Sequence, residues 1–108
     1  MKKIMLMFFI IFSFGFGKEI KEISNELDTK IRNYIKREYN VDEYGNTMQK
    51  MMYQSEVENV LWILNNVKKE DSENFKIYQR VLKDFPPDEF GYTMIRMMYE
   101  QELNNKDW

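Results

Sequence analysis

Six of the nine methionines in this 108-residue sequence fall in two copies of the pattern Met-x-x-Met-Met. They are Met48, Met51 and Met52 in the first copy, and Met94, Met97 and Met98 in the second. Residues three and four positions apart lie on one side of an α-helix, so each copy groups three thioether sulfurs. Thioethers are soft ligands that select Cu(I) among biological metals. A periplasmic Cu(I) carrier that uses these helix faces is therefore one hypothesis.

The same methionines have two further interpretations that involve no metal. Methionine is flexible and fills irregular gaps between packed helices. The same plasticity lets an exposed methionine-rich surface grip a partner helix. The pattern occurs twice, which suggests a duplication within the chain, and core positions diverge slowly after such an event. We therefore expect the repeated methionine face to be buried in the core, with no metal bound.

The composition excludes several common kinds of catalytic site. The sequence contains neither His nor Cys, which removes the commonest general base near neutral pH, the Ser-His and Cys-His nucleophile pairs and the usual zinc sites. The Asp-Glu pairs at 42–43 and 88–89 could act in acid and base catalysis, but they stand where helix caps are expected. Glu56 and Glu102 each follow a methionine by one helical turn and are interpreted as structural polar contacts. We expect no catalytic activity and no cofactor.

The methionine pattern belongs to a longer internal repeat. Residues 29–58 align without a gap with residues 75–104, and eleven of the thirty aligned positions are identical. Such self-similarity indicates the duplication of one supersecondary unit.

Each copy of the repeat has the spacing of two helices. Apolar residues recur every three or four positions over residues 20–39, which predicts an amphipathic helix. Asp42 and Asp88 are expected to be the N-caps of the second and fourth helices, which end near Val67 and Asn105. Asp71 or Ser72 is expected to cap the third helix. No stretch shows the alternation of apolar and polar residues that predicts a β-strand.

Gly45 and Gly91 fall in the first turn of the second and fourth helices. A glycine in a helix costs up to about 1 kcal/mol relative to alanine, so its presence in both copies suggests close approach of a neighbouring helix. The sequence therefore predicts an all-α protein in which two repeated helical hairpins form a small four-helix domain with pseudo-two-fold symmetry.

The amino-terminal segment has the pattern of a secretory signal peptide. Two lysines precede an apolar run that ends at Phe16, and Gly17 precedes a charged segment. The run is shorter than the roughly twenty residues that cross a bilayer. We expect cleavage of residues 1–17, a single domain over residues 18–108 and a secreted or periplasmic location. The alternative is an uncleaved signal peptide, which would be the protein's only attachment to a membrane.

The net charge limits the partners of the mature chain. Removal of Lys2 and Lys3 leaves 14 basic side chains (16 minus 2) against 18 acidic ones. An acidic chain is an unsuitable partner for nucleic acid, because Lys and Arg make most phosphate contacts. We expect a protein partner of basic character, or a second copy of the chain in a homodimer.

A continuous apolar segment, residues 60–64, is a candidate contact surface because a helix that is apolar on all sides must be covered on all sides. Either Trp62 or Ile63 faces outward and contacts a partner, or the first hairpin, with its longer first helix, covers the segment. Tyr53 and Tyr99 are further candidates for partner contacts, since Trp and Tyr are favoured at interfaces. The sequence thus predicts a small exported, acidic, helical interaction protein. It would inhibit or sequester a basic protein, or act as a component of an adhesin.

Overall fold

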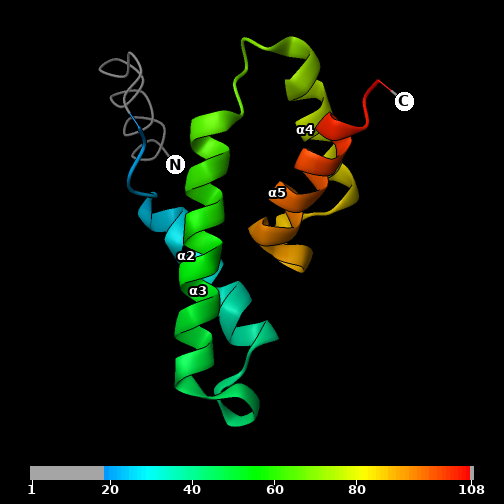
Figure 1. Ribbon diagram of the computed structural model, residues 1–108. Coiled ribbons are helices and arrows are strands. Elements are labelled where there is room, and N and C mark those ends of the chain that lie inside the picture. Colours follow the sequence, from blue (N-terminus) through cyan, green and yellow to red (C-terminus); the bar gives the residue numbers. More distant parts are fainter. Residues whose placement is uncertain (1–18, 108) are drawn as a thin grey trace.

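A computed structural model of the chain describes residues 19–107. Within this range the chain forms four α-helices and no strand (Figure 1). The helices are α2 (Asn25–Glu38), α3 (Val41–Asn66), α4 (Ser72–Asp84) and α5 (Pro87–Asn104). The all-α class predicted from the sequence is confirmed. The predicted signal peptide, residues 1–17, lies outside the described residues.

The longest helix, α3, is the centre of the arrangement. Helix α2 packs on α3 from one side, α5 packs on α3 from another, and α4 packs on α5 (Figure 1). Helix α2 also contacts α5. The two consecutive pairs, α2 with α3 and α4 with α5, are therefore joined chiefly through α3 and α5.

Two clusters of buried apolar side chains form the core. The first contains Ile31, Ile35 and Val60, and the second contains Ile63, Val81 and Ile95. Val60 and Ile63 lie one turn apart on α3, so this helix contributes to both clusters. Tyr92 of α5 packs against both as well. Burial of a side chain of this size stabilises a fold by about 1.5–3 kcal/mol, so packing along α3 holds the two helix pairs together.

Three of the helices begin at a side chain that accepts a hydrogen bond from a free backbone amide. Ser24 accepts from Leu27 N at 3.1 Å, Asn40 from Glu43 N at 2.9 Å, and Asp71 from Asn74 N at 3.3 Å. The fourth, α5, has Pro86 at the cap position and Pro87 at its first position, where the fixed φ of proline suits a helix start.

These helix starts correct two expectations. Asp42 and Asp88 are not N-caps, because α3 and α5 begin before them, and both lie in the first helical turn, where a carboxylate complements the helix dipole. Helix α2 does not include Ile20, because Ser24 is its N-cap. Ile20 instead lies beside α3, in the non-helical segment that precedes α2. Its amide donates to Asn65 Oδ1 at 2.6 Å, and its carbonyl accepts from Asn65 Nδ2 at 2.9 Å.

Helices α3 and α5 each bend at the repeated glycine. Gly45 has φ 85° and ψ 164°, and Gly91 has φ 80° and ψ 164°, which are dihedral angles that essentially only glycine adopts. A Cβ atom on Gly91 would lie 2.7 Å from Cζ of Tyr34, whereas among the described residues no heavy atom would lie within 4 Å of one on Gly45. Close approach therefore explains Gly91 alone, and the backbone conformation explains both. After each glycine a new helical N-terminus begins.

None of the helices in the described part of the chain is long and apolar enough to cross a membrane.

Candidate functional site

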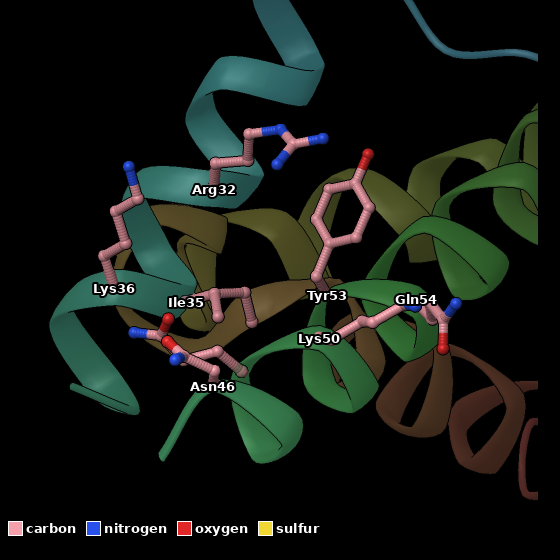
Figure 2. Close-up of a pocket in the computed structure, with 8 residues that line it drawn as sticks. Arg32, Ile35, Lys36, Asn46, Lys50, Tyr53 and Gln54 are labelled. Atoms are coloured by element: carbon pink, nitrogen blue, oxygen red, sulfur yellow. The ribbon is translucent and has the colours of Figure 1, made fainter. Parts of the chain in front are cut away.

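A groove of about 380 Å³ lies between α2 and α3, and Figure 2 shows the side chains that line it. Helix α2 contributes Arg32, Ile35 and Lys36, and α3 contributes Asn46, Gln49, Lys50, Tyr53 and Gln54. Three of these side chains are cations and none is acidic, although the whole chain has a net charge of −2. The groove is a locally basic site on an acidic protein.

Helical spacing places the polar side chains along the groove. Arg32 and Lys36 are four residues apart on α2, and Asn46 and Lys50 are four residues apart on α3, so each pair lies on one side of its helix. Asn46 follows the bend at Gly45, which puts the new helical N-terminus at one end of the groove.

Tyr53 is held in the groove by Asp28 and Arg32 of α2. Its hydroxyl donates a hydrogen bond to Asp28 Oδ1, and Arg32 Nε donates to Asp28 Oδ2 at 2.8 Å. The Arg32 guanidinium carbon lies 4.4 Å from the centre of the Tyr53 ring, and Figure 2 shows it extending toward that ring. The pKa of Asp28 is lowered, chiefly by the hydrogen bond from Tyr53 and next by the one from Arg32. The hydrogen bond between Tyr53 and Asp28 also raises the pKa of Tyr53. The three groups form a fixed wall of the groove.

Lys36 and Lys50 supply the free positive charge of the groove. Within residues 19–107 neither forms an ion pair with an acidic side chain. The amide side chains of Asn46, Gln49 and Gln54, which can both donate and accept hydrogen bonds, complete the lining. This set of groups suits a carboxylate or another anion. The lining side chains include no nucleophile paired with a base, which acyl or phosphoryl transfer by a side chain would need.

A second notable polar group, Glu56 of α3, lies in the interface with α5. It is 5% exposed. Its Oε1 accepts from Tyr92 N at 2.6 Å, and its Oε2 accepts from Thr93 N at 3.1 Å and from the Thr93 hydroxyl. Tyr92 and Thr93 directly follow Gly91, so Glu56 caps the part of α5 that begins after the bend. The interpretation of Glu56 as a structural contact is confirmed.

The repeat counterpart of Glu56 is in a different environment. Glu102 pairs with Arg80 at the surface, with 42% of its side chain exposed. A two-fold relation between the repeats would place Glu102 at the amides of Asn46 and Thr47, which match Tyr92 and Thr93. The buried carboxylate contact is thus made in one direction only, from α3 to α5.

The four residues predicted to contact a partner have different environments. Ile63 and Tyr99 are buried, 4% and 2% exposed, which corrects the expectation that Ile63 faces outward. Trp62 is half-buried, packs edge-to-face on Tyr99 and lies under the guanidinium of Arg96, 4.3 Å from its ring. Only Tyr53 lines the groove between α2 and α3.

The repeated methionines are divided between solvent and the edge of the core. Met51 is 54% exposed and Met97 is 45% exposed, whereas Met52 and Met98 pack against the first and second core clusters. The expectation of a fully buried methionine face is therefore wrong for Met51 and Met97. The buried residues of α3 lie about a quarter turn around the helix from Met48, which leaves Met51 in solvent. Among the described residues, no three His, Cys, Asp or Glu side chains are grouped so that they could hold a metal ion.

Sequence reasoning missed the groove, although the repeat contained a signal for it. Two positions that line the groove are polar in the first copy and apolar in the second: Lys36 matches Leu82, and Gln49 matches Ile95. Both apolar counterparts pack in the second core cluster. A repeat that is apolar in one copy and polar in the other indicates that the polar copy leaves the corresponding face uncovered.

Comparison of this chain with protein-family models, with curated proteins and with solved structures finds no match.

Proposed function

We propose that this protein is an exported, non-catalytic helical module that binds another protein through the groove between α2 and α3. The observation that carries the proposal is the pair of lysines, Lys36 and Lys50, that face the groove beside Tyr53 without an acidic partner in residues 19–107. Cations beside a fixed aromatic ring supply both charge complementarity and apolar contact area, and tyrosine is enriched at protein interfaces.

The charge of the groove determines what kind of segment fits it. The net charge of the chain favours a basic partner, but the groove itself favours an acidic segment. We therefore propose an acidic segment as its occupant, while the acidic remainder of the surface stays available to a basic protein. Sequestration of a partner, inhibition of a partner, or a place in an adhesin would each use a binding module of this kind.

The proposed architecture is two helical hairpin repeats in which Glu56 of the first repeat caps a helix of the second, while within residues 19–107 the matching Glu102 of the second makes no such contact with the first. The one-sided contact of Glu56 supports this arrangement over a two-fold one.

Export is part of the proposal, because residues 1–17 have the pattern of a signal peptide. The mature chain would then begin at Lys18. Intact-mass measurement of the protein from the medium or the cell envelope tests this, and a mass that still includes residues 1–17 would contradict cleavage.

Binding of a fluorescent oligoglutamate peptide, measured by anisotropy, tests the groove. The double variant Lys36→Glu, Lys50→Glu is expected to weaken binding by at least about fourfold, because each change replaces an attraction of about 0.2–1 kcal/mol by a repulsion of similar size. Binding to the unchanged protein is expected to fall as salt is added.

The matched control is Lys68→Glu, Lys69→Glu, which makes the same change of net charge in the connection between α3 and α4. This control is expected to retain peptide binding. Equal losses in both double variants would mean that the peptide senses net charge alone, and the groove would be rejected as the site.

A further inference from the structure

The contact between α3 and α5 consists of polar pairs that the internal repeat contains a second time. Glu56 accepts from the amides of Tyr92 and Thr93. One turn further along α3, Asn59 Nδ2 donates to the Thr93 hydroxyl at 3.1 Å, and Asn59 Oδ1 accepts from Arg96 at 3.1 Å. These groups dock the first repeat onto the second.

An offset of 46 residues, as between Asp42 and Asp88, assigns a counterpart to every member of this contact. On the docking side, Glu56 corresponds to Glu102 and Asn59 to Asn105, both unchanged. The receiving groups also have counterparts: Thr93 is unchanged at Thr47, and the cation Arg96 is replaced by the cation Lys50.

The receiving backbone is also repeated. Gly45 has nearly the same dihedral angles as Gly91, so the amides of Asn46 and Thr47 begin a helix in the same orientation as those that Glu56 caps. Within residues 19–107 no side-chain oxygen accepts from these two amides. They lie at the end of the basic groove, which Asn46 and Lys50 line.

The docking residues of the second repeat are open to solvent in the single chain. A groove of about 560 Å³ beside α4 and the end of α5 is lined by Glu102, Asn105 and Arg80, among others. Glu102 has 42% of its side chain exposed, whereas its counterpart Glu56 is 5% exposed. Polar groups that are buried in the internal contact therefore have counterparts that are exposed at a groove.

We propose that the occupant of the groove between α2 and α3 is a second copy of this chain, docked head to tail. This inference rests on the proposed function and names its partner. Glu102 of one copy caps Asn46 and Thr47 of the next, and Asn105 of the first copy meets Thr47 and Lys50 of the next. Glu102 must leave Arg80 to do so, but an exposed ion pair of this kind contributes only about 0–1 kcal/mol.

The contact between copies is weaker than the contact within the chain. Val60, which lies in the first core cluster together with Tyr92 of α5, corresponds to Lys106, and the fully buried Ile95 corresponds to Gln49. The polar pairs are kept while the apolar centre is lost, so association depends on protein concentration. A head-to-tail contact uses two different surfaces, and it continues through further copies until it forms a ring or a filament.

Sedimentation velocity of the exported protein over a range of concentrations tests the proposal. The weight-average mass is expected to rise with concentration. Glu102→Gln removes the docking charge and Thr47→Val removes the receiving hydroxyl, and each is expected to raise the dissociation constant at least about tenfold, because hydrogen bonds to charged groups are strong. Glu100→Gln makes the same chemical change two residues earlier on α5 and is expected to have no effect.

A mixture of the two weakened variants distinguishes the head-to-tail contact from other modes of association. The Thr47→Val protein keeps Glu102 and the Glu102→Gln protein keeps Thr47, so together they are expected to form one-to-one dimers that do not grow. Full association of either variant alone, or a mixture that stays monomeric at concentrations where the unchanged protein associates, would overturn the proposal. An unchanged protein that is monomeric at all concentrations, yet binds oligoglutamate in its groove, would refute self-association and leave the proposed function standing.

Discussion

Replacing Glu56 by glutamine tests the contact that joins the two halves of the protein. The side chain keeps its shape, but one carboxylate oxygen becomes an amide nitrogen that donates hydrogen bonds. Because all three groups that surround it are donors, the two amides and the hydroxyl of residues 92 and 93, at least one of them loses its acceptor.

The expected cost follows from the burial of this group. A buried donor without an acceptor costs about 1–3 kcal/mol, and loss of a negative charge at a helix N-terminus costs about 0.3–1 kcal/mol more. We expect Glu56→Gln to lower the free energy of unfolding by about 2 kcal/mol. For a domain of this size that corresponds to a melting temperature lower by about 8–16 °C.

The repeat provides a matched control for this measurement. Glu102→Gln makes the same change at the corresponding position, where the carboxylate belongs to an exposed ion pair worth less than about 1 kcal/mol. Urea unfolding followed by circular dichroism, at a protein concentration where all variants are monomeric, compares the two. Equal small losses in both variants would refute the view that Glu56 is an essential cap of α5.

Two further predictions concern the repeated glycines and the partly buried Tyr78. Gly91→Ala should destabilise the protein more than Gly45→Ala, because both incur about 1–3 kcal/mol of backbone strain but only the former also displaces Tyr34; equal losses in urea unfolding would contradict this. Burial raises the pKa of Tyr78 to about 12 from about 10 in an unfolded chain, so its contribution to stability is complete below pH 10 and is lost as the pH rises toward 12. Tyr78→Phe should therefore reduce the alkaline loss of stability seen in unfolding measurements over this range, and an unchanged loss would count against the assignment.

The helices could be predicted from the sequence because their apolar spacing and flanking polar residues are local signals. The cap at Asp71 is of this kind. The caps at Asn40 and Pro86 are not the residues that the sequence predicts, because an aspartate, which is a common N-cap, lies two positions after each of them. The sequence places Gly45 and Gly91 correctly near the starts of their helices. It does not predict the bends there, because glycine can adopt helical as well as positive φ values.

The buried faces were harder to predict, because identity between two copies of a repeat reports common descent as well as burial. Met51 and Met97 match each other and are both exposed, whereas Ile95 is fully buried and matches the polar Gln49. The partners of Glu56 lie 36 and 37 residues away along the chain. No local sequence pattern identifies such a pair of amides, so the hydrogen-bond partners of Glu56 can be found only from the three-dimensional structure.

The shared position of α3 in both core clusters has an evolutionary consequence. An ancestral protein with a single repeat would have exposed the apolar surface that Ile63 now covers on Val81 and Ile95, and a second copy of that protein would have offered a matching surface. Duplication and fusion would have joined two such subunits by a short tether, which raises their effective concentration without any new contact. The present chain would then correspond to a covalent dimer, and the proposed contact between copies would retain the geometry of the ancestral one.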